Sequence, residues 1–76
     1  MTAAKRKSRP WAVILSTPGS PYRTEHTSEA EAYEQVRAEI AAVKAGSRNV
    51  SRIRVEQWDR LADRWQLFDL IDPTTE

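Results

Sequence analysis

The sequence predicts an α+β domain in which a three- to four-stranded, mainly antiparallel sheet packs on one helix, in the order β(β)αββ. Three observations support this prediction. A capping signal followed by a helical apolar stripe occupies the middle of the chain, between residues 28 and 46. Segments rich in β-forming residues flank this stripe on both sides. A chain of 76 residues has room for one hydrophobic core and no second domain.

The first ordered element is expected to be a strand. Residues 1–9 show no hydrophobic period and precede Pro10, so they are expected to form a flexible basic arm. Residues 11–16 are rich in β-forming residues and stop at the Pro- and Gly-containing turn of residues 17–21. Residues 22–27 alternate weakly, so they form either a short edge strand or an extended connection.

The helix is expected to run from about Glu29 to Ala45. Ser28 and Glu31 form a capping box, in which each side chain accepts a hydrogen bond from a free backbone N–H. An apolar stripe follows at helical spacing, and Gly46 suits the left-handed position that ends a helix. The stripe that is expected to face the sheet consists of Tyr33, Val36, Ile40 and Val43.

Two strands joined by a hairpin loop are expected to complete the domain. From Val50 to Trp58, apolar and polar residues alternate, with Ile53 and Val55 on one face and Trp58 on the other. After a loop over residues 59–63, residues 64–71 form the last strand. Simple alternation places Trp65, Leu67 and Ile71 on one side of this strand and Phe68 and Leu70 on the other. The domain is therefore expected to cover residues 10–72, with a tail over 73–76.

The residues that enzymes commonly use are scarce. The chain has no cysteine, and His26 is its only histidine, so a metal centre built from two histidines is excluded. A lone histidine in such a segment is interpreted as a solvated or capping side chain. Two glycines are too few for a phosphate-binding loop. The acidic residues 29, 31 and 34 are explained by the positive end of the helix dipole. We therefore expect no enzyme activity, no metal, no cofactor and no small-molecule substrate.

The candidate binding surface is the sheet face that one helix leaves uncovered. Both faces of the first and last strands carry apolar side chains, and a patch of aromatic residues rimmed by arginine is typical of protein interfaces. Trp58 is expected to be substantially exposed in the monomer and covered in a dimer or partner complex, unless a bulge between Val55 and Trp58 turns it inward. In the other interpretation, strand twist, bulges or the flanking arm cover the excess apolar side chains. The candidate partner-binding residues are Trp58, Trp65, Arg52, Arg54 and Arg64.

Nucleic-acid binding is the alternative, because basic arms neutralise phosphates and strand arginines beside aromatic residues can stack bases. The candidate residues in the arm are Lys5, Arg6, Lys7 and Arg9. The first ten residues hold four of the twelve basic side chains and no acidic one. The other 66 residues therefore hold eight basic against eleven acidic side chains, a net charge of −3 that would repel a polyanion.

Two resemblances bear on function. The segments Trp11-Ala-Val13, Thr27-Ser28 and Glu29-Ala-Glu-Ala-Tyr33 resemble the arm-binding domains of phage-type integrases, although those domains place three strands before the helix and this chain places two after it. The pattern of residues 52–58 and 65–69 looks like the small accessory proteins of actinobacteria and their phages. The second resemblance implies a binding role directed at a host protein or genome, and it implies no functional residue.

The sequence thus predicts a non-enzymatic, phage-type accessory protein that binds a host or partner protein, or a second copy of itself, through the sheet face away from the helix. Its longest apolar run, residues 11–15, is far shorter than the roughly 20 residues that a membrane span needs. We therefore expect a cytoplasmic protein, in the host cytoplasm if a phage encodes it.

Overall fold

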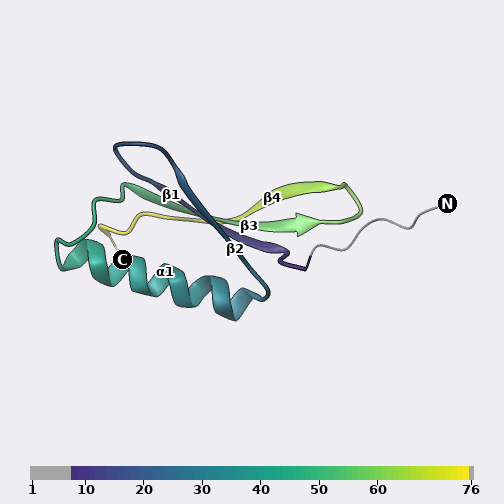
Figure 1. Cartoon of the computed structure of the whole chain (residues 1–76), viewed down its shortest axis with the longest axis horizontal. Coiled ribbons are helices and arrows are strands. Elements are labelled where there is room, and N and C mark those ends of the chain that lie inside the picture. The colour runs from purple at the N-terminus through teal and green to yellow at the C-terminus, as the bar shows by residue number, and fades with distance from the viewer. Residues whose placement is uncertain (1–7, 76) are drawn as a thin grey trace.

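The computed structural model describes residues 8–75 and shows a four-stranded antiparallel sheet with one helix (Figure 1). The elements follow the order β1, β2, α1, β3, β4 along the chain, and the strands lie in the order β2-β1-β3-β4 across the sheet. The predicted α+β fold is confirmed, and the segment after the first turn is a strand. The bounds are β1 Trp11–Ser16, β2 Tyr22–His26, α1 Glu29–Lys44, β3 Arg52–Asp59 and β4 Arg64–Ile71.

The helix begins and ends where its capping residues predict. The Ser28 hydroxyl accepts a hydrogen bond from the Glu31 N–H at 3.1 Å. The Glu31 carboxylate accepts from the backbone N–H of Thr27, one residue before the cap, at 3.0 Å, and this bond lowers the pKa of Glu31. At the other end Gly46 adopts a φ of 79°, the left-handed conformation that a glycine allows without strain.

The hydrophobic core lies between α1 and the face of the sheet turned toward it, which we call the inner face. Alternate residues of β1 and β3 supply the sheet side of the core, and Ala32 and Val36 supply its buried helix side. Tyr33, Ile40 and Val43 are partly buried against it, so the predicted helix stripe is confirmed. The two central strands contribute Trp11, Val13, Leu15, Ile53 and Val55 to this core.

The helix packs mainly on β1 and β2, so β4 and the far end of the second hairpin receive little cover. In Figure 1 the far end of the β3–β4 hairpin extends past the first turn of α1. A hydrogen bond from the Trp58 N–H to the Pro10 carbonyl, at 2.7 Å, continues the β1–β3 pairing toward this end. The two central strands are therefore held over their whole length, whereas β4 forms an edge.

A bulge in β4 changes which side chains share a face. Val55 pairs with Asp69 and the next residue, Glu56, pairs with Leu67, so Phe68 is the extra residue. Phe68 contacts the rings of Trp11 and Tyr33, at centroid distances of 4.8 and 6.4 Å, and therefore lies on the inner face. The alternation predicted for the last strand is wrong in its second half. Leu70 shares the outer face with Trp65 and Leu67, and Ile71 lies on the inner face.

The C-terminal end of the chain differs from the prediction that the domain stops at residue 72. Pro73 is fully buried, and Asp72 accepts hydrogen bonds from the backbone and hydroxyl of Thr74, which lower the pKa of Asp72. The folded part thus continues beyond residue 72, because this turn packs a proline on the domain. The expected arm over residues 1–9 lies largely outside the described residues, which include Ser8 and Arg9 alone of that segment. Among the helical residues described, no segment has the length and hydropathy to cross a membrane.

The Tyr33 hydroxyl connects the helix to β4 by donating a hydrogen bond to Asp69 Oδ2 at 2.8 Å. Burial, this hydrogen bond and the negative charge of Asp69 raise the pKa of Tyr33 above its ordinary value. The neutral phenol is therefore favoured in the folded state.

We predict that stability falls as the pH rises above about 10, because the contribution of Tyr33 is complete below the unfolded-state pKa and is lost as the phenol is forced to ionise. Thermal melting between pH 8 and 11.5 should show a smaller decline for Tyr33→Phe than for wild type. Tyr22→Phe, which alters the exposed tyrosine of β2, is the control and should leave the decline in place. Equal declines in all three proteins would contradict the assignment.

Candidate functional site: the outer face of the sheet

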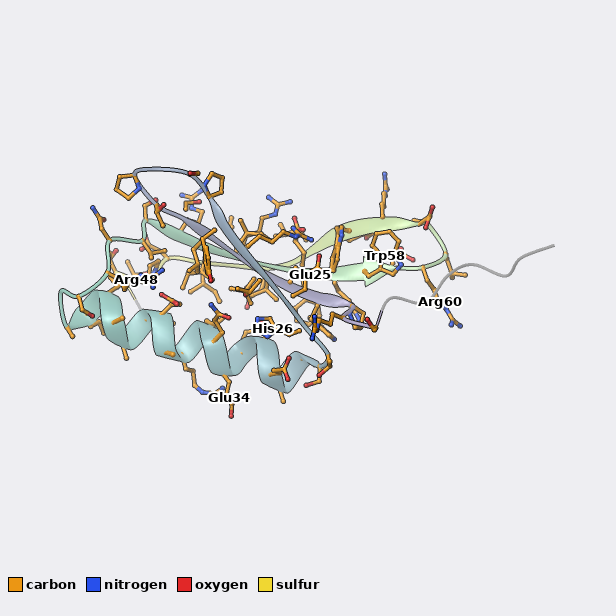
Figure 2. The ribbon with its side chains drawn as sticks, in the orientation of Figure 1. Glu25, His26, Glu34, Arg48, Trp58 and Arg60 are labelled. Atoms are coloured by element: carbon orange, nitrogen blue, oxygen red, sulfur yellow. The ribbon has the colours of Figure 1, made fainter. Side chains whose placement is uncertain are left out.

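The sheet face turned away from α1, which we call the outer face, gathers most of the predicted site. Strand β3 alternates without interruption, so Arg54, Glu56 and Trp58 share this face, as the sequence predicted for Trp58. Their cross-strand neighbours on β4 are Leu70, Leu67 and Trp65, in that order. Figure 2 shows Trp58 on the side of the sheet opposite the helix.

Trp58 and Trp65 form a cross-strand pair. Their ring centroids lie 5.4 Å apart at an interplanar angle of 72°, the edge-to-face arrangement that aromatic quadrupoles favour. Both side chains are half-buried. The prediction that Trp58 is substantially exposed is therefore wrong, because each indole covers part of the other. The face of Trp58 was predicted correctly and its exposure was not.

Arg23, which the sequence did not indicate as a site residue, lies over Trp65. Its guanidinium carbon is 4.6 Å from the Trp65 ring centroid, within the range of a cation–π contact. The same guanidinium reaches Glu56 at 3.3 Å. Strand β1 separates β2 from β3, and Arg23 crosses it where Ala12, a small and fully buried residue, leaves room. The signal that could have indicated Arg23 is the alternation of Arg23 and Glu25 in the weak second strand.

Glu56 contacts two arginines of the outer face. Arg54 Nε lies 2.6 Å from one carboxylate oxygen and Arg23 lies on the other. The Glu56 side chain is 14% exposed, so these contacts are partly shielded from water. The arginines near the tryptophans therefore act first as parts of an ion-paired layer over the sheet.

Two of the predicted arginines lie apart from the tryptophan pair. Arg64 pairs with Asp59 and by alternation lies on the face opposite Trp65, so its predicted place beside the tryptophans is wrong. Arg52 is at the far end of β3, opposite Ser16, where it contributes to the lowered pKa of Asp72. Of the candidate arm residues, Arg9 is exposed, and Lys5, Arg6 and Lys7 lie outside the described residues.

Strand β4 exposes large apolar side chains on both faces. Leu67 and Leu70 are 50% and 48% exposed on the outer face, and Phe68 is 46% exposed on the inner face. No element of the described chain lies beyond β4 in the sheet. Burial of such side chains on binding would be favourable, at roughly 25 cal/mol for each Å² removed from water.

His26 belongs to a polar network between β2 and α1, and Figure 2 places it between the sheet and the helix. Its two ring nitrogens lie 2.9 Å from the Thr24 hydroxyl and 3.3 Å from Glu31. Thr24 in turn contacts Gln35 at 2.9 Å. The interpretation of His26 as a solvated side chain is wrong, because the ring is mostly buried beside Glu31 of the capping box. Within residues 8–75, no three His, Asp or Glu side chains form a group suited to a metal ion.

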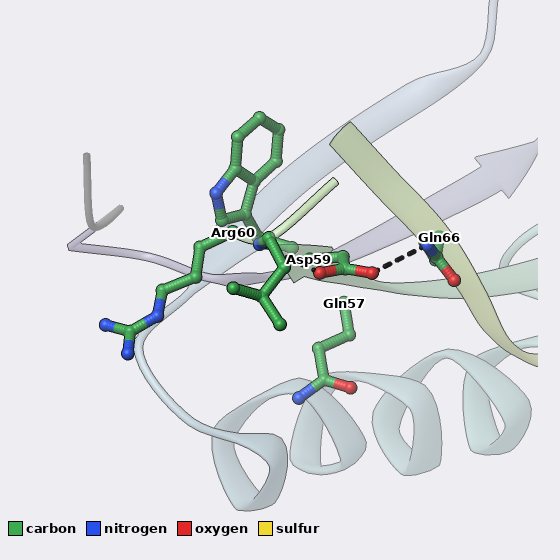
Figure 3. Close-up of a pocket in the computed structure, with 6 residues that line it drawn as sticks. Gln57, Asp59, Arg60 and Gln66 are labelled. Atoms are coloured by element: carbon green, nitrogen blue, oxygen red, sulfur yellow. Dashed lines mark hydrogen bonds between the residues drawn. The ribbon is translucent and has the colours of Figure 1, made fainter. Parts of the chain in front are cut away.

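The turn of the β3–β4 hairpin contains an open hollow of about 420 Å³ (Figure 3). Asp59 accepts hydrogen bonds from the backbone N–H groups of Leu61 and Ala62 and from Gln66 Nε2. Its carboxylate thus fixes the turn, in which Asp63 has a left-handed φ of 56°. The hollow is accounted for by the shape of the turn, and the polar groups described here serve the hairpin itself.

Comparison with known proteins found no matching family model, curated protein or solved structure.

We predict that Trp58→Ala lowers both stability and binding, in contrast to a purely exposed interface residue. Loss of a half-buried indole and of its contact with Trp65 should reduce the free energy of unfolding by about 1–3 kcal/mol. Urea denaturation measures this loss, with Leu61→Ala as control because that side chain is 92% exposed in the turn. A Trp58→Ala protein as stable as Leu61→Ala would contradict the pairing.

Proposed function

We propose that this protein is a non-enzymatic binding module, of the kind found among phage accessory proteins, which uses the outer face of its sheet to bind a partner protein. The observation that carries the proposal is the apolar strip of Leu67 and Leu70, half exposed beside the Trp58–Trp65 pair. An aromatic cluster with adjoining aliphatic side chains and flanking arginines has the composition of protein interface cores.

The distribution of charge supports a protein partner over a nucleic acid. Arg23 and Arg54 both contact the carboxylate of Glu56, and Arg23 also lies 3.5 Å from Glu25, so two carboxylates offset the positive charge next to the tryptophans. A phosphate approaching this face would have to displace Glu56 or remain near its negative charge. Leucine side chains in the same strip offer a nucleic acid no base-stacking surface.

The proposal is tested with two matched substitutions, Leu70→Ser on the outer face and Leu61→Ser in the hairpin turn. Proteins captured from the native host by wild type are identified, and binding to the purified candidate is measured by calorimetry. We expect Leu70→Ser to weaken binding at least about 10-fold, or ~1.4 kcal/mol, and Leu61→Ser to change it little. A partner that binds both variants with wild-type affinity would contradict use of the outer face.

Nucleic-acid binding remains the second candidate function, and it rests on the basic composition of residues 5–9. Affinity for arbitrary duplex DNA is measured between about 50 and 200 mM salt, with and without residues 1–9. Phosphate contacts by the arm require a steep loss of affinity with salt that becomes shallower on truncation. A weak, salt-insensitive interaction that truncation leaves unchanged would remove this candidate.

A further inference from the structure

Strand β4 leaves one row of backbone groups facing the open edge of the sheet. The Trp58–Pro10 hydrogen bond fixes which peptide groups of β3 point toward β1, namely those of its even-numbered residues. The odd-numbered residues of β3 therefore bond to β4, through Arg64, Gln66, Asp69 and Ile71. It follows that Trp65, Leu67 and Leu70 direct their peptide groups away from the sheet.

The exposed apolar side chains of β4 can be covered together only by a partner that contacts both faces of the sheet. Phe68 is about half exposed on the inner face, and Leu67 and Leu70 are about half exposed on the outer face. A protein docked on one face would leave the other uncovered. A strand added along the edge places side chains beside both faces and also pairs the free backbone groups.

From these observations we infer that β4 pairs with β4 of a second copy of this chain, antiparallel and about a two-fold axis at Leu67, with the bulged residues Phe68 and Asp69 together opposite Gln66 of the second copy. This register joins the peptide groups of Trp65 to those of Leu70 of the second copy, which are the groups that point outward. It also sets Trp65 beside Leu70 on the outer face, so that apolar meets apolar across the junction. The inference rests on the proposed function only in treating the outer face as an interface.

Charge complementarity selects a second copy as the occupant. In this register Gln66 lies opposite Asp69 of the second copy, and both belong to the inner face. Arg64 lies diagonally across from the same Asp69, within the reach of a long side chain. The two-fold axis repeats this arrangement, so each copy supplies one cation and one anion to the junction.

The isolated chain protects the same edge with Asp69. The Asp69 Oδ1 atom accepts a hydrogen bond from the outward-pointing N–H of Leu70 at 2.8 Å, and the bulge at Phe68 interrupts the edge beside it. On pairing, the Leu70 N–H transfers to the Trp65 carbonyl of the second copy, and Asp69 Oδ1 becomes free for Arg64. Because one set of bonds replaces another, the dimer is expected to be weak and reversible.

Sedimentation equilibrium of the full chain, from about 10 μM to 1 mM, tests the association. We expect wild type to dimerise within this range. Leu70→Lys should raise the dimer dissociation constant at least 10-fold, because a lysine on an edge strand opposes pairing. Leu61→Lys, which adds the same charge in the hairpin turn, should change it less than about 2-fold. Circular dichroism checks that both variants fold. A wild type that stays monomeric to 1 mM, or equal effects of the two lysines, would overturn the inference.

Cross-linking tests the register, because the chain contains no cysteine of its own. Leu67→Cys places a thiol at the two-fold axis. Tyr22→Cys replaces a side chain of similar exposure, 53% against 50% for Leu67, on the opposite edge strand β2. A short bis-maleimide should convert Leu67→Cys to a covalent dimer at least 10-fold faster than Tyr22→Cys. Equal rates would overturn the register.

The two proposals fail separately in these experiments. A wild-type monomer whose Leu70→Ser variant loses a heterologous partner overturns self-pairing and leaves the proposed function standing. A dimer that forms through β4, but whose Leu70→Ser variant binds each partner as tightly as wild type, supports self-pairing and overturns the proposed function.

Discussion

The position of the single helix is the constraint from which most features of this protein follow. Because α1 packs mainly on β1 and β2, it covers β4 only in part, and no element of residues 8–75 covers the outer face. A sheet in water needs a polar face wherever it is uncovered. Charged side chains supply this polar surface over β2, β1 and β3. Strand β4 has the least polar cover.

The outer face illustrates how an apolar sheet surface can be covered without a second helix. The long side chain of Arg23 lies flat over Trp65 and ends on Glu56, so that its methylene groups and guanidinium cover apolar area while the charge keeps a partner. Arg54 completes the layer from the other side. Individual surface ion pairs contribute little to stability. Their greater effect here is steric, since together they keep water from Ala12 and from one side of the tryptophan pair.

The sequence allowed the helix and the faces of β1 and β3 to be predicted, because each depends on local signals. Ser28, Glu31 and Gly46 mark the helix ends, and strict alternation marks Ile53, Val55 and Trp58. The errors arose where neighbouring strands decide the outcome. The extra residue Phe68 has no local signal in a run that is apolar on both sides, so the faces of Leu70 and Ile71 were exchanged.

The candidate site was predicted in part for the same reason. Trp58 and Trp65 were identified correctly as neighbours on one surface, since both follow from hairpin pairing. The contact of Arg23 with Trp65 depends on the order of strands across the sheet, which composition does not reveal. The half-buried state of Trp58 depends on the register of the hairpin, which sets the two indoles directly opposite each other.

The strand order also has a consequence for how the chain folds. Each hairpin joins strands that are close in sequence, but the central β1–β3 pairing joins residues 11–16 to residues 52–57 and carries most of the core. The entropic cost of closing so long a loop precedes the stabilisation that this pairing provides. This order is typical of slowly folding topologies. The hairpins are therefore favoured as early local structure, and the last contacts to form are those on which the core depends. In native-state hydrogen exchange, the amides of β1 and β3 should accordingly report the global unfolding of the domain.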